Sequence, residues 1–188
     1  MMKNKIIYLT GFMGSGKSTI GPILANTLGW NFIDLDKEIE KTEQSSVTKI
    51  FELKGEEHFR QVEKDLLHKI SKANKLIVAL GGGTLISEKN LNLIKESGFL
   101  VYLKSSPEIL TKRLYFKRDR PILKLDKEEL SENDLLNKIR ILYNQRSKYY
   151  EQADYVIDTD TKQLGRIIDM IVRELYKKIK KSNAEGIK

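Results

Sequence analysis

The sequence predicts an α/β fold in which helices flank a five-stranded parallel sheet. Five short apolar runs rich in Ile, Val, Leu and Tyr recur along the 188 residues, and stretches with helical periodicity separate them. Strands that alternate with helices form parallel βαβ units, and near-continuous apolar runs are typical of strands buried on both faces. At this length we expect a single domain over residues 1–188.

The expected strands are, in chain order, Lys5–Thr10, Asn31–Leu35, Lys75–Leu80, Phe99–Lys104 and Asp154–Asp158. The expected helices are Lys17–Leu28, Val47–Lys54, Glu56–Lys72, Ser87–Ser97, one that opens at Ser106-Pro107-Glu108, Glu132–Gln152, and about 162–181. Ser87 and Ser106 are N-cap candidates, and Pro107 suits a first helical position. A polar, lysine-rich tail over 177–188 is expected to be frayed.

Composition excludes several classes of protein. The chain has no cysteine, so disulfides, zinc–thiolate sites and thiol nucleophiles are excluded. Its net charge of 34 − 26 = +8 suits an anionic partner, which could be a nucleic acid, a phosphorylated metabolite or an anionic membrane. Because acids are interleaved with the basic residues, we expect no nucleic-acid partner. No apolar run approaches the ~20 residues of a membrane span, and no signal-peptide pattern begins the chain. We therefore expect no membrane partner and a cytoplasmic location.

One segment breaks the rhythm of strands and helices. Residues 117–131 are highly charged, contain Arg118, Arg120 and Pro121, and stand where a short connection between helices would be expected. The segment is either a solvated excursion or a mobile lid over a site.

Residues Gly11–Ser18 match the pattern G-x-x-x-x-G-K-[ST], which cradles phosphates. The glycines let backbone N–H groups point at phosphate oxygens, and the following helix adds the positive end of its dipole. Lys17 is expected to reach the β- and γ-phosphates, and the Ser18 hydroxyl to bind Mg²⁺. The motif follows an expected strand and opens an expected helix, so it predicts binding of a nucleoside triphosphate.

The remaining motifs narrow the class of nucleotide enzyme. Asn137-Lys138-Ile139-Arg140 lacks the aspartate of a guanine-binding motif, and no Asp-x-x-Gly is present, which argues against a regulatory GTPase. The third expected strand runs into Gly81-Gly82-Gly83 rather than into an acid, so a small-molecule kinase is favoured over a larger ATPase.

Three weaker signals concern a second substrate. Asp34 and Asp36 would share one face of an extended chain and could hold Mg²⁺ and orient a hydroxyl, although Asp36 could instead cap a helix over Lys37–Lys41. Arg60 and Arg146 lie on expected helices, where an arginine is usually a solvated charge. The glycines at 81–83 form either a tight turn or a close approach to a ligand.

Taken together, these motifs resemble those of the shikimate kinases. The resemblance covers about residues 4 to 175 and rests on six motifs in order: Gly11–Thr19, Asp34-Leu35-Asp36, Phe59-Arg60 with Glu63, Gly81-Gly82-Gly83, Arg120-Pro121-Ile122-Leu123, and Arg146 with Tyr149. It implies a P-loop NTPase fold of the nucleoside-monophosphate-kinase type. The implied reaction is MgATP-dependent phosphorylation of the shikimate 3-hydroxyl, in the pathway to chorismate and aromatic amino acids.

The resemblance also implies residue roles. For the nucleotide, ATP would be bound by Gly14, Ser15, Gly16, Lys17, Ser18, Thr19, Arg113 and Arg120, with Mg²⁺ on Ser18 and, through water, on Asp34. For the acceptor, shikimate would be bound by Asp36, Arg60, Gly82, Gly83 and Arg146, with Glu63 holding Arg60. The implied catalytic residues are Lys17, Asp36 and Arg120, the last on the lid. The family is commonly monomeric, so a monomer is expected.

Two rival functions stay open on the sequence. Another small kinase, acting on gluconate or a nucleoside monophosphate, would also use paired arginines for a carboxylate or phosphate, although Asp34 and Asp36 favour a polyol acceptor. A non-catalytic nucleotide-binding module with a basic surface is disfavoured by the set of acceptor motifs.

Overall fold

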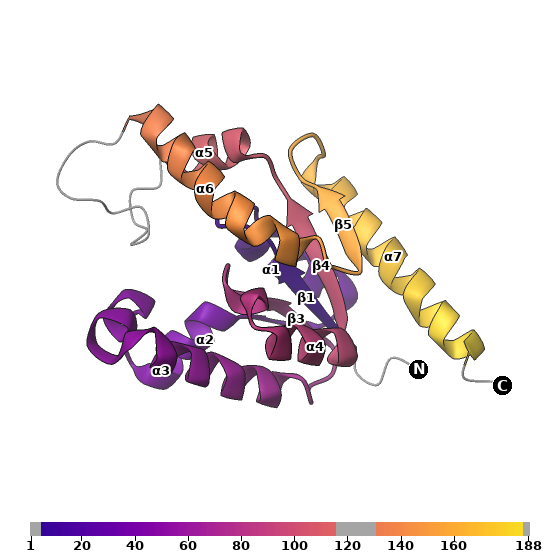
Figure 1. Cartoon of the computed structure of the whole chain (residues 1–188). Coiled ribbons are helices and arrows are strands. Elements are labelled where there is room, and N and C mark those ends of the chain that lie inside the picture. Colours follow the sequence, from indigo (N-terminus) through magenta and orange to yellow (C-terminus); the bar gives the residue numbers. More distant parts are fainter. Residues whose placement is uncertain (1–4, 116–130, 186–188) are drawn as a thin grey trace.

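The computed structural model describes residues 5–115 and 131–185 (Figure 1). The expected lid, 117–131, therefore lies outside the described residues with the exception of Ser131, and so do Arg118 and Arg120. Ser131 caps the helix that follows, accepting a hydrogen bond from the Asp134 backbone N–H at 3.2 Å.

Five parallel strands form one sheet in the order β2-β3-β1-β4-β5. Their bounds are Ile6–Thr10 for β1, Asn31–Asp34 for β2, Leu76–Ala79 for β3, Phe99–Lys104 for β4 and Tyr155–Asp158 for β5. The predicted five-stranded parallel sheet is thus confirmed, and each expected strand is correct to within one residue at either end.

The helices are α1 (Lys17–Leu28), α2 (Leu35–Glu43), α3 (Val47–Ile70), α4 (Glu88–Ser97), α5 (Pro107–Tyr115), α6 (Glu132–Tyr150) and α7 (Leu164–Glu185), with a short 3-10 turn η1 (Thr84–Ile86). Two expected helices, Val47–Lys54 and Glu56–Lys72, form the one element α3. They meet at Gly55, whose φ of 80° and ψ of 170° are not helical, so the predicted break is present as a kink.

The sheet carries a separate apolar core on each face because side chains alternate along its strands. Ile7 and Leu9 of β1 point to the face covered by α1 and α7, and Ile6 and Tyr8 point to the face covered by α3, α4, α5 and α6. Figure 1 shows the same three layers, with α7 on one side of the sheet and α3, α4 and α6 on the other.

The last helix is longer than we expected. We predicted that it would end near residue 181 and that the tail from residue 177 would be frayed, but α7 continues to Glu185. Tertiary contacts hold the first part of this tail in the helix. Lys178 pairs with Asp154 at 2.9 Å and lies over the ring of Phe99, and Ile179 packs on the α1/α7 core. Within the described residues, no helix is long and apolar enough to cross a membrane.

Candidate active site

The candidate site lies along the edge of the sheet where all five parallel strands end. Each strand leads there into one part of the site: β1 into the loop Gly11–Gly16, β2 into Asp34, β3 into the turn Gly81–Gly83, β4 into Ser105, and β5 into Thr159. In open α/β sheets, ligands bind outside the carboxyl ends of the strands, where the strand order reverses. Here β3 and β4 lie on opposite sides of β1, which places the phosphate loop at that point.

Backbone conformation explains the glycines of the phosphate loop. Gly11, Gly14 and Gly16 have φ values of 143°, 82° and 101°, which residues other than glycine rarely adopt. A Cβ atom at Gly11 would also lie 2.6 Å from the Leu103 carbonyl oxygen. The loop runs directly into the first turn of α1, where Lys17, Ser18 and Thr19 stand. Its N–H groups and the helix dipole therefore form an anion site.

The Lys17 ammonium group lies within the phosphate loop. Its Nζ donates to the carbonyl oxygens of Gly11 at 2.7 Å and Phe12 at 3.2 Å. Close by, the buried hydroxyl of Ser15 has no hydrogen-bond partner among the described residues. Buried polar groups normally find partners, so a polar ligand inside this loop would satisfy Ser15.

The residues proposed for Mg²⁺ come together as expected. Ser18 on α1 donates its hydroxyl to Asp34 Oδ2 at 3.2 Å. A hydroxyl and a carboxylate are oxygen ligands of the kind Mg²⁺ takes, and the described residues contain no cluster of three or more His, Cys, Asp or Glu that could hold a metal on their own. The donor set fits a Mg²⁺ ion that completes its shell with phosphate oxygens and water, as Mg²⁺ commonly does.

Asp36 is near Asp34, but not for the reason we gave. We expected both residues in extended backbone, whereas β2 ends at Asp34 and Asp36 lies in the first turn of α2. Asp34, rather than Asp36, caps that helix, with Oδ1 accepting the Asp36 N–H at 3.2 Å. The helical turn brings the two carboxylates together in place of a shared strand face.

The environment of Asp36 changes its acidity. Burial, followed by the charges of Asp34, Glu63 and Glu40, raises the pKa of Asp36 from 3.8 to about 6, and the nearby Lys17 opposes the rise. The carboxyl group remains mostly ionised above pH 7. It is thus a proton acceptor with a pKa near neutrality, as general bases often have.

The side chains expected to bind the phosphoryl acceptor meet at the turn Gly81–Gly83. A Cβ atom at Gly81 would lie 2.6 Å from Asp36 Oδ1. One at Gly82 would lie 3.1 Å from Arg146 Nη1, and one at Gly83 would lie 2.8 Å from Arg60 Nη2. Each of the three expected acceptor side chains thus approaches one glycine of the turn at a distance that leaves little or no room for another side chain.

Sequence reasoning missed two residues that support this turn. The buried Tyr150 donates its hydroxyl to the Gly82 carbonyl oxygen at 2.6 Å and also bonds to Arg146. The buried Thr84 donates to Glu63 Oε1 at 2.7 Å, and Glu63 Oε2 accepts from Arg60 Nη1 at 3.0 Å. The arginine–glutamate pair expected from Phe59-Arg60 and Glu63 is therefore present, with a third member that no local pattern signals.

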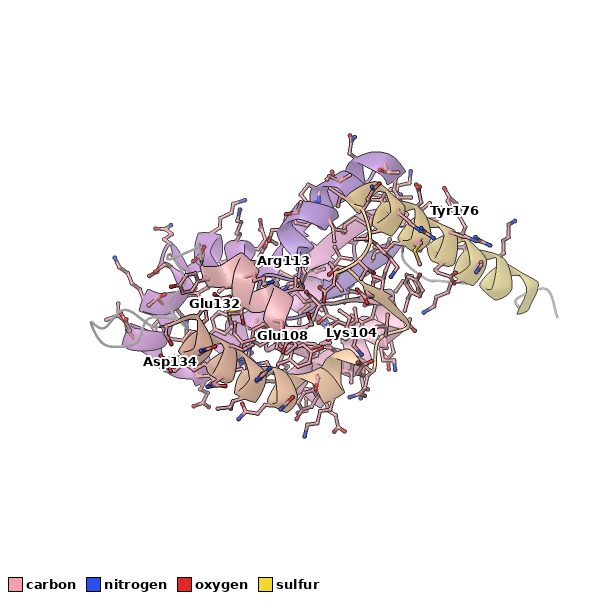
Figure 2. All side chains as sticks on the ribbon, turned by 90° about the horizontal axis from the view of Figure 1, so that it is seen from above. Lys104, Glu108, Arg113, Glu132, Asp134 and Tyr176 are labelled. Carbon is pink, nitrogen blue, oxygen red and sulfur yellow. The ribbon has the colours of Figure 1, made fainter. Side chains whose placement is uncertain are left out.

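Arg113 comes from α5, beside α6 (Figure 2), and reaches the nucleotide side of the edge. Its guanidinium donates to the carbonyl oxygens of Gly14 and Thr159, each at 3.3 Å. Asp160, which sequence reasoning did not identify, accepts hydrogen bonds from the Ser105 hydroxyl and, at 2.8 Å, from the Ser106 N–H. The segment after Asp158 thus supports the environment of Arg113.

Comparisons with known proteins agree with this geometry. The family model "Shikimate kinase" matches residues 13–179. A shikimate kinase of Chlorobaculum tepidum is 45% identical over 97% of this chain and 96% of its own length. The solved structure of the Acinetobacter baumannii shikimate kinase in complex with shikimate has a TM-score of 0.83 at 31% identity, over 94% of this chain and 96% of that one.

A gluconokinase of Sinorhizobium meliloti shares the fold at a TM-score of 0.61, with 16% identity over 98% of each chain, which is evidence for the fold only. The two shikimate kinases match over a similar length but at 45% and 31% identity against 16% for the gluconokinase, and their matches cover both the phosphate loop and the turn that gathers the two arginines. The chain belongs to the shikimate kinase family.

Proposed function

We propose that the chain transfers the γ-phosphoryl group of MgATP to the 3-hydroxyl of shikimate, and that the residues gathered at the sheet edge perform the steps. The assignment of residues rests on one observation: the side chains of Asp36, Arg146 and Arg60 each approach one of three consecutive glycines. It supports an acceptor site that offers a carboxylate, two guanidinium groups and backbone N–H groups around one turn.

The nucleotide phosphates bind the loop N–H groups of Gly14, Ser15 and Gly16 and the side chain of Lys17. Ser18 and, through water, Asp34 would hold the Mg²⁺ ion, which would neutralise charge on the phosphates. Thr19 extends the phosphate contacts in the first turn of α1. Catalysis in this class of reaction is mostly positioning and charge stabilisation, and a phosphate loop supplies both.

The adenine side is formed around Arg113. Its guanidinium plane is fixed by carbonyl oxygens of the phosphate loop and of the segment after β5, so it is preorganised to lie against a planar base. We assign Arg113 to adenine stacking on that basis.

The shikimate carboxylate binds between Arg60 and Arg146, whose planar forks suit a carboxylate. The N–H groups of Gly82 and Gly83 are proposed to bind ring hydroxyls. Asp36 holds the reacting 3-hydroxyl. As the oxygen–phosphorus bond forms, the bond from the γ-phosphorus to the bridging oxygen of ADP breaks, and the hydroxyl proton passes to Asp36. Arg120 is proposed to offset charge on the transferring group.

The decisive experiment separates the two substrates. Arg60→Ala and Arg146→Ala are expected to weaken shikimate binding by about 2–5 kcal/mol, roughly 30-fold or more in Kd, because each removes one member of a charge-assisted pair. Calorimetric titration with MgADP should change little. Arg140→Ala is the matched control, because Arg140 lies on α6 like Arg146 but pairs with the exposed Glu108 at 2.7 Å.

Equal losses for both ligands, or no loss for shikimate, would contradict the acceptor assignment. A coupled ADP-release assay across shikimate, gluconate, AMP and CMP tests the acceptor itself, and faster turnover with any of the other three would favour the rival small-kinase functions. A monomeric state, a cytoplasmic location and the lack of nucleic-acid or membrane partners are part of the proposal, and light scattering after gel filtration would test the first.

A further inference from the structure

Glu63 is a fully buried carboxylate beneath the proposed acceptor site. It comes from α3, one turn after Arg60, and its two oxygens have different partners. Oε2 accepts from Arg60 Nη1 at 3.0 Å, and Oε1 accepts from the hydroxyl of Thr84 at 2.7 Å. On its exposed side, Arg60 also pairs with Glu56 at 3.1 Å. The buried contact, rather than the exposed one, constrains the guanidinium strongly, because exposed ion pairs contribute little.

Thr84 is held rigidly from its other side. It is fully buried and follows Gly83 directly as the first residue of η1. Its carbonyl oxygen accepts from the buried Asn90 Nδ2 of α4 at 3.2 Å, and its N–H donates to the Gly81 carbonyl oxygen at 3.3 Å. The residue therefore belongs to the glycine turn by its backbone and to the Arg60–Glu63 pair by its hydroxyl.

We propose that Thr84 is a positioning residue for shikimate, whose hydroxyl fixes Glu63 and through it the guanidinium of Arg60 against the glycine turn. The inference rests on the proposed role of Arg60 in binding the acceptor carboxylate. A carboxylate in the protein interior needs hydrogen bonds at both oxygens, and Thr84 supplies the one that Arg60 does not. With that bond in place, Arg60 and the N–H groups of Gly82 and Gly83 are held in their relative positions before the substrate binds. This preorganisation lowers the entropic cost of substrate binding.

Two substitutions at Thr84 separate the hydroxyl from the volume of the side chain. Thr84→Val keeps the branched shape and removes the hydrogen bond, and Thr84→Ser keeps the hydroxyl and removes a methyl group. We expect Thr84→Val to raise the Kd and KM of shikimate about 10-fold, since a hydrogen bond to a charged group contributes of that order. Its affinity for MgATP should stay within about 2-fold, and Thr84→Ser should stay close to the parent in shikimate affinity.

Two further variants distinguish positioning from packing. In a Glu63→Gln background, Thr84→Val should have little additional effect on shikimate binding, because the two residues act through one contact. Thr111→Val is a matched control, since Thr111 is equally buried but donates its hydroxyl to the Pro107 carbonyl oxygen on α5, away from the acceptor residues. It should change thermal stability without changing the Kd of shikimate.

The outcomes are distinct. Equal loss of shikimate affinity in Thr84→Val and Thr84→Ser, or equal loss of shikimate and MgATP affinity in Thr84→Val, would overturn the inference in favour of a packing role. If Arg60→Ala weakens shikimate binding and Thr84→Val does not, the inference fails while the proposed function stands. If Arg60→Ala itself leaves shikimate binding intact, the proposed function fails first.

Discussion

Replacing Asp36 by asparagine should inactivate the enzyme and at the same time make it more stable at neutral pH. The folded-state pKa of Asp36 exceeds the ordinary value by about 2, and each unit of pKa corresponds to about 1.4 kcal/mol. The ionised carboxylate therefore lowers the free energy of unfolding by about 3 kcal/mol above pH 7. Asparagine has the shape of the protonated acid without its charge, so Asp36→Asn should recover about 2–3 kcal/mol.

The sign of the pH dependence makes the prediction specific. A raised pKa means that the folded protein holds the Asp36 proton between about pH 4 and pH 6, where the unfolded chain has released it. The parent thus loses stability as pH rises through this window, and Asp36→Asn does not. Urea unfolding at pH 4 and pH 7.5 should show almost no difference between the two proteins at the lower pH and the full difference at the higher one.

A control and an activity measurement complete the test. Glu38→Gln removes another carboxylate from the first turn of α2 and should give no comparable gain. In the parent, kcat/KM should fall below about pH 6, as the base becomes protonated. If Asp36→Asn is no more stable than the parent at pH 7.5, or if its gain is the same at pH 4, then the burial of a charged Asp36 does not have the cost worked out above.

Three further outcomes are expected. Lys17→Ala should remove MgATP turnover, measured by ADP release, while circular dichroism shows an unchanged fold, and near-native turnover would contradict the phosphate-loop assignment. Gly83→Ala should weaken shikimate binding, because the new Cβ would lie 2.8 Å from Arg60 Nη2. Backbone strain would not be the cause, since the φ of −109° at Gly83 suits alanine. Gly165→Ala is the control, because its Cβ would have no atom within 4 Å. Arg120→Ala should slow the single-turnover rate by roughly 10³-fold or more with little change in shikimate Kd, and an unchanged chemical step would refute its catalytic role.

The parts of the protein that depend on neighbouring residues in the chain were predictable from the sequence. The strands were recognisable because burial on both faces requires continuous apolar runs, and their parallel arrangement followed from the helices between them. The phosphate loop was predictable because its contacts are local. Within Gly11–Ser18 the Lys17 side chain and the Ser15 N–H donate to carbonyl oxygens of the loop itself. Local chemistry also located the break at Gly55 and the start of α5 at Pro107.

The residues of the proposed acceptor site stand in the sequence only as a set of separate signals. Gly81–Gly83, Arg60 and Arg146 come from a turn, α3 and α6, and nothing in the spacing of these residues states that each arginine approaches a particular glycine. Their grouping came from a resemblance to a family. The tertiary structure supplies the reason, because α3 and α6 cover the same face of the sheet and bring their arginines to the turn that follows β3.

Tertiary structure decided how the site is supported and how its groups ionise. It placed Asp36 on a helix that Asp34 caps, where we had expected an extended chain, and it surrounded the carboxyl group with the burial and charge that raise its pKa. It also paired Thr84 with Glu63, 21 residues away in the chain. A hydroxyl in a sequence can bond to many partners, and a carboxyl group can have a wide range of pKa values. Which partner and which value are realised depends on the groups that folding brings within a few ångströms and on the water that it excludes.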